Sequence, residues 1–229
     1  STRRPRRTSS TGQGSPLGCG LTRRPTRRPQ PRSGPRAAAA PPGPDLDDYG
    51  VAQAVRLGER LAGERLDAVY SSDLVRAVQT AKAVAGRFGL PTRQLPGLRE
   101  IGAGDDEMSA DLARYVAVLR SWGTGDPAAR IPGGESGLEF VARFDAAVRE
   151  AVADGHSTAL LVSHGAAIRS WSGYVMPPLR ELMIRRGLPN TAVITAEGDP
   201  DAGWLLVGVD FPEADPDDGF TVVDGVVAD

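Results

Sequence analysis

The most informative part of the sequence runs Leu160-Leu161-Val162-Ser163-His164-Gly165-Ala166-Ala167-Ile168-Arg169. The apolar stretch 158–163 predicts a strand buried on both faces of a parallel sheet, and residues 166–174 predict a helix. In open α/β sheets, ligands bind beyond the carboxyl ends of the strands, and the free N–H groups at a helix N-terminus attract anions such as phosphate. His164 and Gly165 lie at that junction and are candidates to bind a phosphate group. A histidine there can equally cap the strand end without binding anything.

A second strand-to-helix junction lies earlier in the chain. Residues 66–70 predict a strand, Ser71-Ser72-Asp73 an N-cap, and residues 74–88 a helix that Gly89 ends. Arg76 falls on the first turn of that helix, again at the carboxyl edge of the predicted sheet. A guanidinium group there can form paired hydrogen bonds with a phosphate group. A surface salt bridge is the alternative role for Arg76.

A carboxylate lies in a glycine-rich stretch of the chain, Leu98-Arg99-Glu100-Ile101-Gly102-Ala103-Gly104. This motif falls within residues 95–108, which we predict to be irregular. Glu100 can serve as a general acid if its surroundings raise its pKa. Taken alone, the motif is a weak indication of function.

The other predicted elements complete an alternation of strands and long helices. They are a helix from 51 to 61 capped by Asp47-Asp48, helices at 110–122 and 135–153, a turn at 132–134, and a hairpin of strands 191–196 and 204–210 around a turn at 197–200. Strands that alternate with helices favour an α/β fold. We therefore expect a three-layer sandwich, in which a mostly parallel sheet carries helices on both faces.

Charge and composition divide the 229 residues into unequal parts. Residues 1–44 contain ten arginines, nine prolines and no acidic residue, so the rest of the chain carries all 29 acidic residues against 17 basic ones. A segment with so few apolar side chains cannot bury enough surface to fold. We predict a disordered basic segment at 1–40, one α/β domain at 41–212 and an acidic tail at 213–229. The basic segment lacks the interleaved aromatic residues typical of single-strand binding, so we do not expect it to bind nucleic acid.

Several classes of protein are excluded by what the sequence lacks. No apolar run is long enough to cross a bilayer, and no apolar run of the kind found in secretory signals follows the basic N-terminus. Cys19 is the single cysteine, so the chain has no internal disulfide and no cluster of cysteine metal ligands. We expect a cytoplasmic protein without a membrane segment. The oligomeric state is left open.

Four motifs occur together and in order: Ser71–Ala81, Leu98–Gly104, Pro132–Ser136 (Pro-Gly-Gly-Glu-Ser) and Val162–Arg169. In this order they resemble the histidine phosphatase superfamily, also called phosphoglycerate mutase-like. The resemblance extends over residues 41–210. It implies the three-layer α/β fold expected above and an enzyme that acts on small phosphorylated substrates.

The resemblance also implies a mechanism and a role for each site residue. In the family, a histidine in an N-terminal Arg-His-Gly motif attacks the phosphoryl group and forms a phosphohistidine. Two arginines and a second histidine hold the phosphoryl oxygens, an acid protonates the leaving oxygen, and no metal or other cofactor is needed. By resemblance, Arg76 is the second arginine, Glu100 the acid and His164 the second histidine. Hydrolysis of phosphate monoesters is favoured over mutase activity, because no stretch resembles the longer substrate loops of the mutase.

The chain departs from the family pattern at the nucleophile. It contains two histidines, His156 and His164, and neither precedes Arg76. His156 lies across the predicted strand from His164, about 26 Å away at ~3.3 Å per residue, so it is no substitute. The family's strand that carries the nucleophile lies inside the sheet, and without it strand 158–163 has an unpaired edge. We therefore expect the chain to be catalytically inactive and less stable than other family members.

Three hypotheses account for this departure. In the first, the reading frame before residue 41 is wrong, and another frame upstream of Pro41 encodes Arg-His-Gly. In the second, the protein is a non-catalytic relative that binds phosphorylated ligands through Arg76 and His164. In the third, the basic segment 1–40 has an unrelated binding or scaffold role. The nucleotide sequence upstream of Pro41 tests the first hypothesis.

Overall fold

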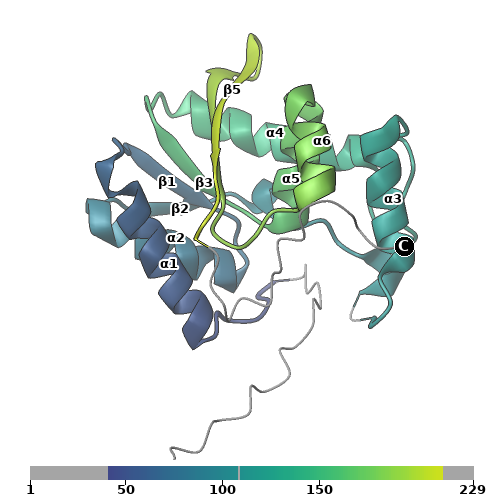
Figure 1. Ribbon diagram of the computed structural model, residues 1–229, viewed down its shortest axis with the longest axis horizontal. Coiled ribbons are helices and arrows are strands. Elements are labelled where there is room, and N and C mark those ends of the chain that lie inside the picture. The colour runs from purple at the N-terminus through teal and green to yellow at the C-terminus, as the bar shows by residue number, and fades with distance from the viewer. Residues whose placement is uncertain (1–40, 108, 214–229) are drawn as a thin grey trace, which may run out of the picture. The chain divides into compact units, whose positions relative to one another are not determined.

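A parallel sheet forms the middle layer of the molecule (Figure 1). The computed structural model describes residues 41–107 and 109–213. Within them, three strands lie in the order β2-β1-β3: β1 (Ala68–Ser71), β2 (Thr92–Gln94) and β3 (Ala159–Val162). Both pairings are parallel, so the three carboxyl ends meet at one edge of the sheet.

The side chains of β1 alternate between the two faces of the sheet, as the pleat of a strand requires. Ala68 and Tyr70 belong to one hydrophobic cluster, while Val69 belongs to another on the opposite face. Since both sets are buried, the central strand needs a layer of helices on each side. The predicted three-layer α/β architecture is confirmed.

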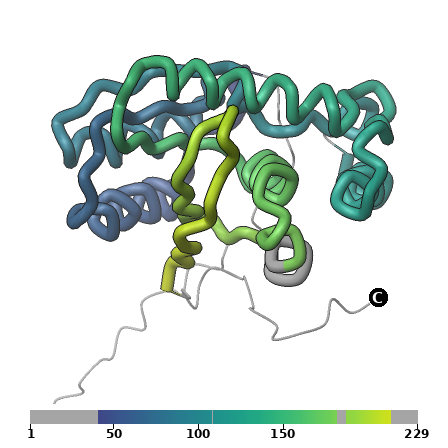
Figure 2. Tube along the Cα trace, turned by 90° about the horizontal axis from the view of Figure 1, so that it is seen from above, coloured from purple at the N-terminus to yellow at the C-terminus, as the bar shows by residue number. Residues whose placement is uncertain are grey.

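Two helices cover the Val69 face: α1 (Asp48–Arg60) and α2 (Val75–Phe88). The Asp47 side chain caps α1 as predicted, accepting the N–H of Gly50 at 2.7 Å. Gly89 ends α2 with a positive φ of 66°, a left-handed conformation that glycine adopts without strain. Figure 2 shows α1 on one side of the sheet and α4 on the other.

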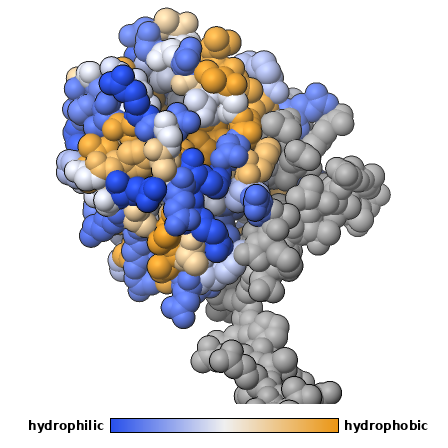
Figure 3. Space-filling model, turned by 60° about the vertical axis from the view of Figure 1, so that its left-hand side comes forward, coloured by the Kyte–Doolittle hydropathy of each residue, from blue (hydrophilic) through white to orange (hydrophobic). Residues whose placement is uncertain are grey.

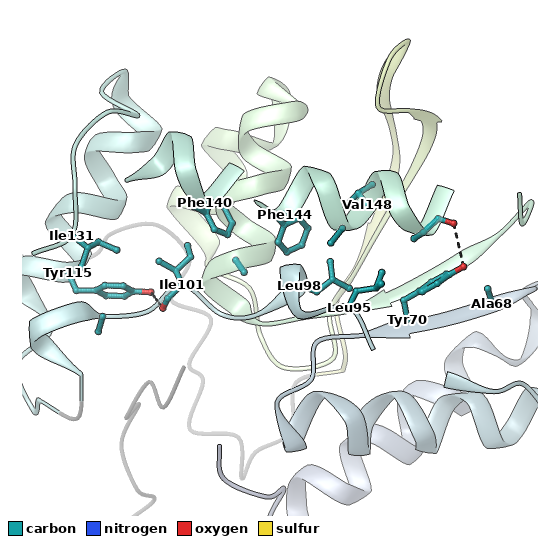
Figure 4. Packing of buried hydrophobic residues seen from close by; sticks show 14 residues of the cluster. Ala68, Tyr70, Leu95, Leu98, Ile101, Tyr115, Ile131, Phe140, Phe144 and Val148 are labelled. Carbon is teal, nitrogen blue, oxygen red and sulfur yellow. Dashed lines mark hydrogen bonds between the residues drawn. The ribbon is translucent and has the colours of Figure 1, made fainter. Parts of the chain in front are cut away.

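The Tyr70 face is covered mainly by α4 (Gly137–Ala153), together with α5 (Gly165–Val175) and α3 (Ala113–Thr124). Phe140 and Phe144 of α4 are buried with ring centroids 5.8 Å apart, and they point toward the strands (Figure 4). Ser136 and Glu139 form a reciprocal capping box at the start of α4. This large apolar cluster fixes α4 and α5 against the sheet.

The C-terminal part of the described chain consists of α6 (Pro177–Arg186) and a hairpin of β4 (Val193–Asp199) and β5 (Gly203–Asp210). The hairpin forms a separate two-stranded sheet. Trp204 of β5 packs edge-on against Trp171 of α5, with centroids 5.9 Å apart. Leu160 of β3 and Val193 of β4 pack against one small cluster, so the hairpin lies close to β3 without pairing with it.

One prediction about β3 was wrong. The apolar sequence indicated burial on both faces, but Ala159 is exposed, Leu160 and Leu161 are only partly buried, and Val162 alone is buried. The reason is that β3 lies at the edge of the sheet among the described residues, with β1 as its one paired neighbour. Among residues 41–107 and 109–213, no strand pairs with the other edge of β3.

Smaller differences concern element boundaries. The sequence did not predict β2 or α6, and the hairpin turn falls after Asp199 rather than at 197–200. Residues 95–107 are irregular as expected, apart from two short 3-10 turns at Pro96–Leu98 and Gly104–Asp106.

The predicted basic segment 1–40 lies outside the described residues, as does the predicted tail beyond Glu213. Of the helices in 41–107 and 109–213, none has the length and apolar character needed to span a membrane. On the face drawn in Figure 3, hydrophobic side chains form patches that alternate with polar ones.

Candidate phosphate-binding site

The two strand-to-helix junctions come together at the carboxyl edge of the sheet. Strands β1 and β3 pair along their length, so their last residues, Ser71 and Val162, lie side by side. The segments that follow the two strands therefore begin next to each other. Arg76 is the second residue of α2, and His164 is the N-cap residue of α5. The positive charge of Arg76 lowers the pKa of His164 and opposes the burial that raises the pKa of Glu100.

A buried serine links the two junctions directly. Ser72 Oγ lies 2.8 Å from Nε2 of His164, and it accepts a hydrogen bond from the N–H of Leu74 at 3.1 Å. The triplet 71–73 was predicted to cap α2, but the N-cap residue is Leu74, which makes no side-chain capping bond. Ser72 thus holds the histidine of the neighbouring junction in place.

His164 is a buried, neutral histidine. Only 6% of its surface is exposed. Burial, together with the nearby positive charges of Arg76 and Arg143, lowers its pKa from 6.5 to about 3, while Asp73 opposes the shift. Among the described residues, none forms a hydrogen bond with its Nδ1. That nitrogen is therefore the one left to meet a ligand.

Glu100 occupies the helix terminus where the sequence had predicted free N–H groups. Its Oε1 accepts the N–H of Ala167 at 2.8 Å, and its Oε2 accepts that of Ala166 at 3.3 Å. Oε1 also accepts the N–H of Ile101 at 2.9 Å. These bonds take up the second and third amides of α5. The expectation of a free helix N-terminus is thus corrected, and the first amide, that of Gly165, is the one left for an anion.

Burial dominates the electrostatics of Glu100 and Arg76. Desolvation raises the pKa of the Glu100 carboxyl group, although three backbone N–H bonds and Arg76 act in the opposite direction. Burial also lowers the pKa of the Arg76 guanidinium, against the attraction of Glu100 and Glu107. Burial thus favours the neutral form of each group, and the charge of the other opposes that shift.

Arg143 of α4 supports the loop that carries Glu100, and the sequence analysis did not single it out. Its guanidinium donates to the carbonyls of Gly97 at 2.9 Å, Arg99 at 3.0 Å and Glu100 at 3.1 Å. It also pairs with both carboxylate oxygens of Glu135, at 2.8 and 2.6 Å. One side chain therefore fixes the backbone at Glu100.

A second ion pair joins this loop to the Arg76 junction. Arg99 donates through Nε to Asp73 Oδ1 at 2.6 Å and contacts the other carboxylate oxygen as well. Ser163, at the end of β3, donates its hydroxyl to the carbonyl of Leu98 at 2.8 Å. These contacts hold the loop that carries Glu100 against the carboxyl ends of β1 and β3.

His156 does not belong to this site. It is exposed and precedes β3, whereas His164 follows β3, so the strand separates the two histidines. Within residues 41–107 and 109–213, no three side chains of histidine, cysteine, aspartate or glutamate are grouped in a way that could hold a metal ion. The metal-free site stays a prediction.

Comparison with known proteins places the chain in a family. A family model described as the histidine phosphatase superfamily (branch 1) matches residues 34–210. The PE-PGRS family protein PE_PGRS11 of Mycobacterium tuberculosis is 31% identical over 193 residues, which cover 75% of this chain and 33% of that protein. A probable phosphoglycerate mutase GpmB of Proteus mirabilis is 37% identical over 127 residues, 54% of this chain and 59% of that protein. The chain thus spans only a third to three fifths of these relatives.

Solved structures of similar fold lead to the same family as the sequence relatives. A mycobacterial glucosyl-3-phosphoglycerate phosphatase is 29% identical, with a TM-score of 0.59 over 71% of this chain and 86% of that one. The protein YhfR of Bacillus stearothermophilus is 28% identical, with a TM-score of 0.58 over 72% of this chain and 84% of that one. By sequence and by fold, the chain belongs to the histidine phosphatase superfamily.

Proposed function

We propose that this chain carries the phosphate pocket of a phosphatase that acts on phosphate monoesters of small molecules. The observation that supports this most directly is the convergence of Arg76, His164 and Glu100 at the carboxyl edge of the sheet, around the N-terminus of α5. A guanidinium, a neutral imidazole and helix amides are donors suited to the oxygens of a phosphate group. The relatives named as phosphatases and mutases act on such substrates.

Each residue has a role that follows from its surroundings. Arg76 pairs with two phosphoryl oxygens. His164 stays neutral because of burial and nearby positive charge, and it donates a hydrogen bond from Nδ1. Gly165 offers its backbone N–H. Glu100 supplies a proton to the leaving oxygen, since burial favours its protonated form.

The phosphohistidine route needs a nucleophile that this sequence does not supply. His164 is held by Ser72, and His156 lies beyond the other end of β3. We therefore propose that the 229-residue chain binds phosphate groups and does not hydrolyse them. A protein whose natural role is to bind phosphorylated ligands without turnover is the second candidate function, and the unpaired edge of β3 is compatible with both.

One experiment separates the two candidates. Residues 1–40 are replaced by a segment that carries the Arg-His-Gly strand typical of the family, and hydrolysis of p-nitrophenyl phosphate is measured. The phosphatase proposal predicts turnover by the graft, no turnover by the original chain, and none by a graft with alanine at the supplied histidine. A folded graft that binds phosphate without hydrolysis would favour the binding protein.

A further inference from the structure

Glu100 occupies two of the three backbone amides at the N-terminus of α5, beside the Gly165 amide proposed to bind a phosphate group. Its carboxylate receives the N–H groups of Ala166 and Ala167 on the first turn of α5. The partial positive charge of a helix N-terminus favours one anion and is largely neutralised once an anion is bound. A phosphate group bound at Gly165 and Arg76 therefore competes with an ionised Glu100 for the same positive charge.

We propose that Glu100 is an internal anion that fills the phosphate site until a ligand displaces it, and that the displaced carboxylate takes up one proton from solvent as the ligand binds. This inference rests on the proposed function, because it concerns the same pocket. Its consequence is that ligand binding completes the protonation of Glu100 that burial already favours, and so supplies the neutral acid that hydrolysis requires.

The charges around Glu100 support this coupling. The positive charge of Arg76 on α2 stabilises the ionised carboxylate of Glu100. The negative charges of Glu100 and Glu107 raise the pKa of Tyr115 on α3. Arg143 of α4 is already paired with Glu135. Once a dianion pairs with Arg76, Glu100 loses both its helix amides and its cation. Burial and the adjacent anion then favour its protonated form.

The side chain can move while the backbone stays in place. Arg143 holds the carbonyls of Gly97, Arg99 and Glu100, so the main chain at this point is fixed from α4. The capping contacts of Glu100 to α5 are made through its two carboxylate oxygens alone. Release of Ala166 and Ala167 therefore requires a change in the side chain of Glu100 and none in the backbone that Arg143 holds.

The test uses inorganic sulfate, a tetrahedral dianion that does not titrate near neutral pH, so that any linked proton belongs to the protein. Calorimetric titrations of the full chain at pH 6–8, in buffers of different ionisation enthalpy, give both the affinity and the number of protons taken up. The variants are Glu100→Gln, which keeps the shape and removes the charge, and Glu100→Ala. Glu64→Gln is the control, since Glu64 is exposed at the amino-terminal edge of the sheet.

We expect the wild type and Glu64→Gln to take up nearly one proton per sulfate and to bind more weakly as the pH rises. Glu100→Gln is expected to bind sulfate roughly tenfold more tightly at pH 8, with no linked proton. Glu100→Ala is expected to give the same result as Glu100→Gln. Agreement between the two variants shows that the result does not come from a folding defect in one of them. Proton uptake that persists in both variants would belong to a group other than Glu100 and would overturn the inference. Equal affinities would also overturn it and leave the proposed function intact. Absence of sulfate binding to the wild type and to all three variants would contradict both the inference and the proposed function.

Discussion

Ser72 and His164 are joined across the two strand-to-helix junctions by a contact of 2.8 Å between Oγ and Nε2, and neither side chain is more than 6% exposed. Ser72 directly follows β1, the strand that precedes Arg76, and His164 is the N-cap residue of α5, the helix whose amides bind Glu100. The contact therefore joins the junction that carries Arg76 to the junction that carries His164.

The substitution Ser72→Ala removes the partner of Nε2 and leaves a buried polar nitrogen unsatisfied. We expect the free energy of unfolding to fall by about 1–3 kcal/mol, as measured by urea denaturation. Ser157→Ala, at an exposed serine, is the control and should leave stability unchanged. Equal stability of the two variants would show that the contact with His164 has no energetic importance.

The free energy of unfolding should depend on pH in the way expected for a buried, neutral His164. Its pKa is about 3 in the folded chain, against an ordinary value of 6.5 when it is exposed to water, so the unfolded chain binds a proton first as the pH falls. The unfolding free energy contributed by His164 is fully present above pH 6.5 and declines toward pH 3, approaching about 1.4 kcal/mol per pH unit.

His164→Gln should reduce this decline between pH 6.5 and 5, whereas His156→Gln, at the exposed histidine, should retain it. Glu100 has the opposite sign, because its raised pKa adds stability at low pH that is lost as the pH rises through the folded value. Since Glu100 is present in both variants, its contribution cancels in the comparison. Identical pH profiles would contradict the assignment of a buried neutral His164.

Arg143→Lys tests the support of the Glu100 loop. A lysine cannot reproduce the planar fork that contacts Glu135 and three carbonyls together, so we expect a loss of roughly 2 kcal/mol in unfolding free energy and weaker sulfate binding. Arg120→Lys on the exposed side of α3 is the matched control. If both variants unfold at the same urea concentration, Arg143 does not anchor the loop.

Gly97→Ala tests the close approach of the loop to α4. A Cβ atom at Gly97 would lie 2.6 Å from the carbonyl oxygen of Arg143 and 2.7 Å from Cβ of Ala147. The loop must shift, at a cost of about 1–3 kcal/mol, and Glu100 shifts with it. Gly86→Ala, in α2 with open space around it, should gain about 0.5–1 kcal/mol. The two variants should therefore change the thermal midpoint in opposite directions.

The sequence predicted the architecture because its main signals are local. Apolar periodicity, the cap at Asp47 and the terminating Gly89 act within a few residues, and they placed α1, β1 and α2 correctly. Strand β2 was missed because Thr92–Gln94 is short and polar, without the alternation that marks a half-buried strand. Arg143 was missed because one arginine among many has no local signal for contacts with a loop about 45 residues away.

The burial of β3 was overestimated for a related reason. An apolar strand sequence indicates the environment of a complete sheet, and the number of strands that pair beside it is a property of the whole fold. Likewise, a carboxylate that returns to cap another helix, as Glu100 does on α5, depends on tertiary contacts between residues 66 and 67 positions apart. Such contacts set the chemistry of the site.

In the proposed function, Arg76 and His164 form an anion pocket that binds a phosphate group without hydrolysing its esters. The decisive measurement is a calorimetric titration of the 229-residue chain with inorganic phosphate. We expect saturable binding of one phosphate per chain, lost in Arg76→Ala, weakened in His164→Gln and unchanged in His156→Gln. Phosphate binding that persists unchanged in Arg76→Ala, or a wild-type chain that binds no phosphate, would contradict it.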